Sequence, residues 1–303
     1  MLQSSADVSA PGRPPEIEAV TNLYLVHPVS RALVDRLVDT FVTPNQVSVA
    51  SVFMAAAGGY SFWALAWPWN ALAGFAFLFG WHVLDGADGD LARRTGRASP
   101  LGELIDGVCD HASQLLVYVA LALVLQRSLG PWAWLFAVLA GASHFVQSNA
   151  YETGRKTYRR WVYGADWMRQ TSLNAKPDAH VGRALSGVYM SISNLANPGE
   201  ASIEAAMNPM LAESPAVRQA VRSVYREIYA PLVKTSGVLD GNTRTMAMFA
   251  SMLAGSPLWF FLFEIVFLNV ALAALSFMRT QCNARLPEAL RTETRLQAID
   301  DGL

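Results

Sequence analysis

Long apolar runs alternate with short polar or Gly/Pro-rich breaks over most of this chain. A helix that crosses a bilayer needs roughly 20 residues, which most of these runs supply alone or together with a polar end. The run over 246–278 is too long for one crossing, and Gly255-Ser256-Pro257 divides it. We therefore predict six transmembrane helices, at about 46–66, 71–84, 101–125, 132–150, 238–254 and 258–278.

An amphipathic segment precedes the first predicted span. Its apolar positions recur every four residues, as on one face of a helix, and they are Val29, Leu33, Leu37 and Phe41. Such a helix is typical of the membrane interface, but an ordinary amphipathic helix packed on protein fits the pattern equally well. Thr43-Pro44-Asn45 then separates this segment from the first span.

Polar stretches flank and interrupt the membrane region. Residues 1–28 are polar and Pro-rich, and we expect them to be poorly ordered. The membrane domain then covers 29–280, with a polar insertion at about 153–237. Residues 281–303 form a polar tail.

Composition indicates a lipid-facing surface and excludes other classes of protein. Of the 303 residues, 52% are hydrophobic and 16% are charged, whereas a soluble domain carries about 25% charged residues. The formal net charge of -1 provides no basic field for nucleic acid. Cys109 and Cys282 are too few for a disulfide framework or a zinc cluster.

Basic residues indicate the orientation of the chain in its membrane. They gather between spans two and three, after span four and after span six, whereas the opposite side shows only Arg127. The positive-inside bias therefore predicts a multi-pass protein of the cell or inner membrane with its acidic segment facing the cytoplasm. Over that face, apolar patches at 185–192 and 216–229 predict short helices of the insertion.

Four aspartates are the chemically informative part of the sequence. Asp85 and Asp88 are three residues apart and share one face of the second span. Asp106 and Asp110 are four apart and share one face of the third. Because the connection between these helices is short, we expect them to run antiparallel with their acidic ends together. Carboxylates so close would repel one another and would need cations.

These four carboxylates favour phosphoryl chemistry on a pair of metal ions. An all-oxygen ligand set suits Mg²⁺ or Mn²⁺ better than zinc, and two such ions clamp the attacking and leaving groups of a displacement at phosphorus. Gly89 lets a ligand approach closely, and Arg93 offers a planar fork for a diphosphate. A calcium loop of the EF-hand type is excluded, because it needs Asp or Asn where Ala87 stands.

The spacing D-x-x-D-G-x-x-A-R-x(8)-G-x(3)-D-x(3)-D, from Asp85 to Asp110, resembles the signature of the CDP-alcohol phosphotransferase family. All eight fixed positions of that signature are filled. The predicted spans and the amphipathic segment also match the membrane core of the family over about 29–278. The resemblance implies an all-α membrane enzyme that synthesises phospholipid on two Mg²⁺ or Mn²⁺ ions per active site.

The resemblance also implies roles for individual residues. The implied metal ligands are Asp85, Asp88, Asp106 and Asp110. Asp110 would in addition act as the catalytic general base on the acceptor hydroxyl. The residues implied for the CDP moiety are Gly89, Ala92, Arg93, Gly102 and, more weakly, Asn45. Members of the family commonly form homodimers.

Three functions are open at this point. The first is transfer of a phosphatidyl group from CDP-diacylglycerol, a CDP-activated lipid donor, to a small polar alcohol acceptor with release of CMP. The second is a CDP-aminoalcohol:diacylglycerol phosphotransferase, which the run 99–103 resembles, although Gly107 stands where that subgroup has histidine. The third, of another class, is a divalent-cation transporter, which should instead place acidic groups near the bilayer midplane.

Two further polar groups have more than one interpretation. A weak candidate for an acceptor or anion site follows span four and consists of Arg155, Lys156, Arg159 and Arg160. It could bind a phosphorylated acceptor, or it could set the membrane topology and bind anionic lipid headgroups. The polar residues inside apolar runs could line the acceptor cavity or form interhelical hydrogen bonds, and they are His144, Gln147, Asn149, Glu152, Glu264 and Asn269.

Overall fold

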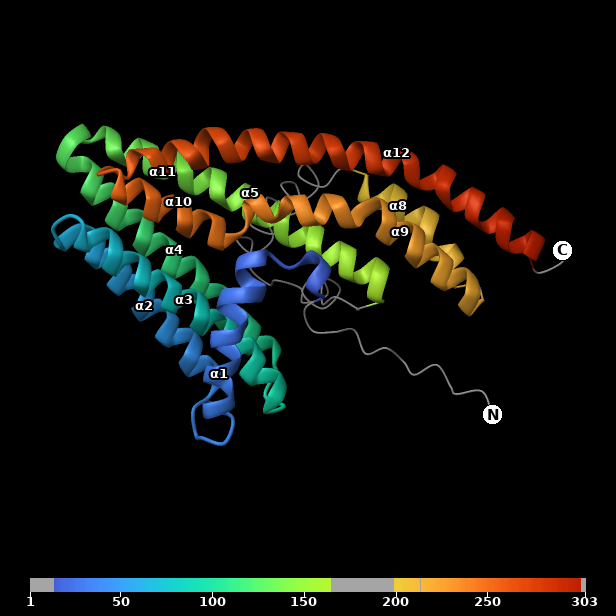
Figure 1. Ribbon diagram of the computed structural model, residues 1–303, viewed down its shortest axis with the longest axis horizontal. Helices are drawn as coiled ribbons and strands as arrows, with labels where there is room; N and C mark the ends of the chain where they lie inside the picture. Colours follow the sequence, from blue (N-terminus) through green and yellow to red (C-terminus); the bar gives the residue numbers. More distant parts are fainter. Residues whose placement is uncertain (1–13, 165–198, 213, 301–303) are drawn as a thin grey trace, which may run out of the picture. The chain divides into compact units, whose positions relative to one another are not determined.

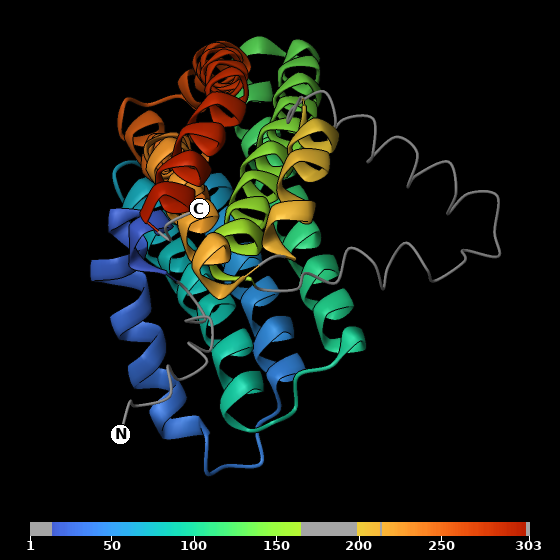
Figure 2. The same ribbon diagram turned by 90° about the vertical axis from the view of Figure 1, so that its right-hand side faces the viewer.

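The computed structural model describes residues 14–164, 199–212 and 214–300, and over these residues the chain is all-α, as predicted (Figures 1 and 2). Contacts between helices divide the chain into two compact units. One comprises Ala19–Phe145 and Asp240–Asn269 and carries the four aspartates, so we call it the aspartate unit. The second unit comprises the described parts of Met1–Glu18, Val146–Leu239 and Val270–Leu303. The helix predicted at 185–192 lies outside the described residues.

The aspartate unit is built from helices that correspond to most of the predicted spans. They are η2 (Asn22–Val26), α1 (His27–Leu37), α2 (Pro44–Ala64), α3 (Trp69–Arg94), α4 (Pro100–Leu129), α10 (Gly241–Leu253), α11 (Leu258–Leu262) and η4 (Phe263–Phe267), together with the first part of α5 (Trp132–Tyr163). The turn between α10 and α11 falls at the predicted Gly255-Ser256-Pro257 break, where Gly255 has a φ of 85° that a side chain would strain.

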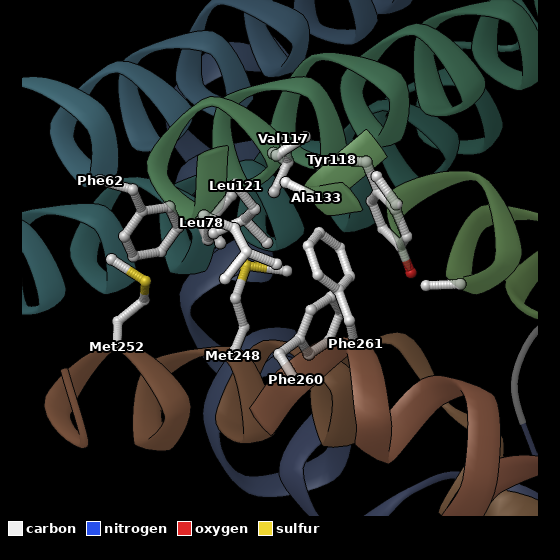
Figure 3. Close-up of a cluster of buried hydrophobic side chains, with 14 of the residues drawn as sticks. Phe62, Leu78, Val117, Tyr118, Leu121, Ala133, Met248, Met252, Phe260 and Phe261 are labelled. Carbon is white, nitrogen blue, oxygen red and sulfur yellow. The ribbon is translucent and has the colours of Figure 1, made fainter. Parts of the chain in front are cut away.

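A hydrophobic core holds α2, α3 and α4 against α5, α10 and α11. Figure 3 shows Met248 and Met252 of α10 and the rings of Phe260 and Phe261 pointing toward side chains of α2, α3 and α4. Phe62 of α2 is among the side chains that they meet, with 1% of its surface exposed. Burial of an apolar side chain of this size contributes about 1.5–3 kcal/mol, so this core fixes the helices that carry the aspartates.

The N-terminal segment of the aspartate unit departs from the expectation for residues 1–28. Its described residues from Asn22 onward are helical, as η2 and the first turn of α1, rather than poorly ordered. The amide of Asn242 donates to Thr21 Oγ1 at 3.1 Å and to Asn22 Oδ1 at 2.6 Å. These contacts tie the N-terminal segment to a residue more than 200 positions away in the sequence.

Helix α1 packs on α3 close to the acidic segment. Val34 of α1 is fully buried with Ala87 and Leu91 of α3. By contrast, Val29 and Phe41 of the same apolar stripe are exposed, at 45% and 89%. The helix thus makes a protein contact, while its position in the membrane interface stays a prediction.

The second unit contains the insertion and the C-terminal helix. Its helices are η1 (Pro15–Ile17), the end of α5, α8 (Glu200–Leu211), α9 (Pro215–Thr235), η3 (Ser236–Leu239) and most of α12 (Leu268–Asp300). Helix α5 continues to Tyr163 instead of ending near residue 150, because Trp161 and Tyr158 of its last turns pack against Tyr225 of α9. The predicted helix at 216–229 is confirmed within α9.

Within the part of the chain that the structure describes, three helical stretches are long and apolar enough to cross a membrane: Pro44–Ala64, Pro100–Leu129 and Leu258–Thr292. They support a membrane protein. Among the other predicted spans, α10 has 13 residues, fewer than the roughly 20 of a full crossing. The prediction of six spans is therefore met in part, and the remaining three crossings stay a prediction.

Candidate metal and nucleotide site

The end of the aspartate unit that carries the site is formed by two tight connections. In both views the α1–α2 and α3–α4 connections lie at the same end of this unit (Figures 1 and 2). Thr43 caps α2 by accepting from the Gln46 amide, while Gln46 Oε1 accepts from the Thr43 amide at 2.9 Å. Pro44 occupies the first turn, where its missing N–H costs nothing. The Thr43-Pro44-Asn45 motif is thus a helix start that leaves the Asn45 side chain outside the cap.

Helices α3 and α4 begin and end so that their acidic turns meet. Ser99 caps α4 by accepting from the Gly102 amide at 3.0 Å. Helix α3 continues through its acidic stretch to Arg94, since the Asp90 carboxylate pairs with Arg93 at 3.5 Å and with Arg94 at 3.3 Å. Arg94 also pairs with Asp35 of α1. Asp90 is therefore engaged in ion pairs along its own helix and stands apart from the other aspartates.

Three of the four predicted metal ligands converge. Carboxylate oxygens of Asp85, Asp106 and Asp110 all lie within 4.8 Å of one another, and each of the three side chains is half-buried. Asp85 comes from α3 and the other two from α4, so the antiparallel pair brings together side chains that the sequence separates. These distances suit oxygen ligands of a shared divalent cation.

Asp88 is the buried member of the set, with 4% of its surface exposed. Its carboxylate is close enough to Asp106 and Asp85 to be repelled by their charges. Its Oδ2 accepts a hydrogen bond of 2.6 Å from the Ser48 hydroxyl of α2, and its Oδ1 lies at the Gly89 amide. Ser48 is a site residue that the sequence analysis missed. The only available signal was a small hydroxyl one turn after the helix start, inside an otherwise apolar run.

The donor set fits a hard divalent cation. All four side chains offer oxygen, and Mg²⁺ and Mn²⁺ prefer carboxylate oxygens, whereas soft metals prefer thiolate. Cys109 is the thiol nearest in sequence to these carboxylates, but it is buried within α4. Four carboxylates also exceed what one divalent ion neutralises, so the charge balance fits a pair of ions.

The predicted CDP contacts cluster beside these carboxylates. A Cβ placed on Gly89 would lie 3.4 Å from a guanidinium nitrogen of Arg93. A Cβ on Gly102 would lie 3.2 Å from Ser99 Oγ and 3.5 Å from Asn45 Oδ1. Asn45 of α2 and Gly102 of α4 are therefore neighbours, although 57 positions separate them in sequence. Ala92 is half-buried on α3, one residue before the exposed Arg93.

His111 has a structural role in this arrangement. Its Nδ1 donates to the Gly107 carbonyl at 2.6 Å, one turn back along α4. Its ring also lies edge-on to Phe145, with centroids 6.5 Å apart.

The other polar residues of the aspartate unit make interhelical contacts. His144 Nδ1 lies 3.1 Å from the Tyr118 hydroxyl and 3.6 Å from Glu264 Oε1. Glu264 also accepts from Arg244 Nε at 3.0 Å. Asn269 donates to Ser143 at 2.9 Å. These contacts favour the second interpretation of the residues, namely interhelical hydrogen bonding.

The basic residues proposed for an acceptor site lie in the second unit. Arg155 pairs there with Glu18 and with Glu152, and Arg160 pairs with Glu204 at 2.6 Å. Lys156 and Arg159 are half-buried on the same helix, α5. Arg155 and Arg160 thus already neutralise carboxylates of this unit.

The comparisons with known proteins concern the region that carries this site. Residues 41–172 match the family model described as CDP-alcohol phosphatidyltransferase. An uncharacterized CDP-alcohol phosphatidyltransferase class-I family protein of Dictyostelium discoideum is 36% identical over 81 residues, which are 27% of this chain and 19% of that protein. Cholinephosphotransferase 1 of Gallus gallus is 40% identical over 68 residues, 22% of this chain and 20% of that protein.

A bacterial relative aligns over a longer stretch. The bifunctional IPC transferase and DIPP synthase of Aquifex aeolicus is 33% identical over 114 residues. The match covers 38% of this chain and 25% of that protein. The chain thus spans a quarter or less of the length of these curated relatives.

Proposed function

The chain carries a CDP-alcohol phosphatidyltransferase domain over residues 41–172, and from this premise we propose that it transfers a phosphatidyl group from CDP-diacylglycerol to a small polar alcohol, releasing CMP. The observation that carries the proposal is the convergence of Asp85, Asp106 and Asp110 within 4.8 Å, with Asp88 held beside them. Carboxylates so close serve a reaction in which several anionic oxygens must be bound at once.

The four aspartates would hold two Mg²⁺ or Mn²⁺ ions. Ions bound there would neutralise the diphosphate of the donor and stabilise the charge on the leaving CMP. The protein supplies the geometry, since two ligands come from each of two helices that the core fixes. Asp88 is held through Ser48, so the set is oriented before a donor arrives.

The residues around the aspartates would bind the cytidine diphosphate. Arg93 is exposed at the end of α3, and its guanidinium can donate two parallel hydrogen bonds to a phosphate. Gly89 and Gly102 would let the donor approach the backbone closely, because neither residue carries a side chain. The Asn45 side chain, outside the helix cap, and Ala92 would also contact the nucleotide.

Asp110 would act as the general base. It follows Asp106 by one turn of α4, and it is half-buried. Its carboxylate would accept the proton of the acceptor hydroxyl as that oxygen attacks the β-phosphorus of the donor. The bond from this phosphorus to the oxygen of the CMP leaving group breaks, and the new phosphodiester forms.

A membrane location follows naturally from this chemistry. The donor is a lipid, so its acyl chains stay in the bilayer that the apolar helices cross. We propose six crossings with the aspartates facing the cytoplasm, where nucleotide and divalent cations are available. A homodimer, as the family resemblance implies, is the assembly that we propose.

A CDP-aminoalcohol:diacylglycerol phosphotransferase is the second candidate. It is favoured by the relatives named cholinephosphotransferase 1, which are 38–41% identical over 68 or 69 residues. Against it, Gly107 stands where that subgroup is expected to have a histidine. The cation-transporter alternative gains nothing from the comparisons and is not retained.

One assay separates the two candidates. Purified protein in lipid nanodiscs is supplied with Mg²⁺ and either CDP-diacylglycerol or CDP-choline, each with the cytidine radiolabelled. Serine, glycerol phosphate, inositol, inositol phosphate and choline are offered to the first donor, and diacylglycerol to the second. We expect labelled CMP only from CDP-diacylglycerol, with one alcohol. CMP release from neither donor, with Mg²⁺ or with Mn²⁺, would refute both candidates.

A further inference from the structure

A direct hydrogen bond joins the aspartates to α2 through Ser48. Its hydroxyl lies 2.6 Å from Asp88 Oδ2, and both side chains are buried, at 3% and 4% exposure. The same hydroxyl lies 3.2 Å from the Pro44 carbonyl. A hydroxyl has one proton, and the shorter contact to a charged acceptor is the stronger hydrogen bond. The Ser48 hydroxyl therefore donates its hydrogen bond to the Asp88 carboxylate.

This contact determines how Asp88 can turn. A carboxylate has about four lone-pair positions, and Ser48 occupies one on Oδ2 while the Gly89 amide lies at Oδ1. In the metal-bound protein, the remaining positions would bind a cation shared with Asp106 and Asp85. Without the hydroxyl the side chain could rotate about its Cα–Cβ and Cβ–Cγ bonds, away from two carboxylates that repel it.

We propose that Ser48 is a positioning residue of the metal site, which fixes the Asp88 carboxylate toward the ions held by the other three aspartates. This inference rests on the proposed function for the existence of that metal site. It adds a ligand-orienting residue from a third helix, α2, to a signature confined to α3 and α4. Hydrogen-bond partners that orient metal ligands typically contribute about 10- to 100-fold to metal affinity.

The chain offers a matched control for this role. Ser51 lies one turn farther along α2 and is equally buried, at 2% exposure. Its hydroxyl donates to the Ser48 carbonyl at 2.7 Å, which is a backbone contact within the helix. Replacing Ser51 therefore removes the same atoms from the same helix without touching an aspartate.

The test measures Mn²⁺ binding by electron paramagnetic resonance on purified protein without any lipid or nucleotide. We expect Ser48→Ala to raise the Mn²⁺ dissociation constant by about 10- to 100-fold. Ser48→Thr, which keeps the hydroxyl, should stay within a few-fold of wild type, and so should Ser51→Ala. In an Asp88→Asn background, Ser48→Ala should have little further effect. Wild-type affinity in a folded Ser48→Ala protein would overturn the inference.

Two controls keep the outcomes distinct. Circular dichroism and size-exclusion chromatography report whether each variant is folded. If Ser48→Ala does not fold, Ser48→Cys replaces it, because cysteine has a similar volume and is a weaker hydrogen-bond donor. If Ser51→Ala weakens Mn²⁺ binding as much as Ser48→Ala does, the effect is one of helix packing and the positioning role is wrong. If wild-type protein binds no Mn²⁺, the metal site of the proposed function fails as well. If wild-type protein binds Mn²⁺ and Ser48→Ala binds it equally well, only the inference about Ser48 is refuted.

Discussion

Gly74 of α3 is a point at which the helix packing of the aspartate unit can be tested quantitatively. A Cβ built at this position would lie 2.3, 2.5 and 2.7 Å from Cε1, Cδ1 and Cζ of Phe62. Carbon atoms in contact normally lie about 3.5–4.0 Å apart. All three distances are therefore too short by about 0.8 Å or more, and the ring is only 1% exposed. Gly74→Ala must displace Phe62 from its rotamer or separate α2 from α3.

The expected cost is the difference between two effects. Overpacking of this kind costs about 1–3 kcal/mol, while replacing a helical Gly by Ala gains about 1 kcal/mol. Gly141→Ala in α5 is the matched control, because a Cβ there meets only Tyr118 Cδ1 at 3.9 Å, an ordinary contact. Relative to Gly141→Ala, we expect Gly74→Ala to lower the free energy of unfolding by about 1–3 kcal/mol.

Equilibrium unfolding in mixed micelles, followed by tryptophan fluorescence and circular dichroism, would measure these differences. Phe62→Leu removes the ring atoms that cause the overlap, so Gly74→Ala should cost less in that background than in wild type. The expected coupling between the two substitutions is about 1–2 kcal/mol. Equal stability of Gly74→Ala and Gly141→Ala would refute the packing of α2 against α3 described above.

Three further predictions concern the site and the second unit. Asp110→Asn should retain most nucleotide binding, measured by calorimetry with CDP, but lower turnover by about 10²- to 10⁴-fold, as loss of a general base does; wild-type turnover would remove Asp110 from that role. Chelation with EDTA should abolish CMP release, and Mg²⁺ or Mn²⁺ should restore it while Zn²⁺ does not. Burial alone would raise the pKa of Glu16, but hydrogen bonds from Tyr163 and Tyr158 and the charge of Arg226 lower it from the ordinary 4.5. A carboxylate whose pKa is lower in the folded than in the unfolded protein stabilises the fold at a pH above its unfolded-state pKa. This stabilisation is lost as the pH falls through the pKa of the folded state. Acidification below about pH 4.5 should therefore lower the thermal unfolding temperature of wild type more than that of Glu16→Gln.

The local sequence pattern was sufficient to predict that the aspartates of α3 and α4 lie close together. Asp106 and Asp110 share a face because they are four apart, and the short connection at 95–99 leaves α3 and α4 little choice but to run antiparallel. The helix starts at Thr43 and Ser99 were likewise readable, since both are good capping residues followed by proline. What helical period and capping determine locally was therefore predictable.

Long-range contacts account for what the sequence did not reveal. Ser48 meets Asp88 from 40 positions away, and Asn242 contacts residues near 21 from the other end of the chain. Helix α5 runs past residue 150 because Trp161 finds aromatic partners on α9, a helix separated from it by more than 50 residues. The periodicity of apolar residues does not predict such contacts between distant parts of the sequence. The crossing predicted at about 238–254 stays a prediction, because α10 has 13 residues, fewer than the roughly 20 of a full crossing.

The four carboxylates lie close together in the sequence, so they are synthesised within a short interval of translation. All four lie on one hairpin, from Asp85 to Asp110, and closing so short a connection costs little chain entropy. During translation all four aspartates are therefore present once α4 has left the ribosome, before α10 and α11 exist. Cations can then screen the mutual repulsion of the acidic turns before the rest of the unit is made.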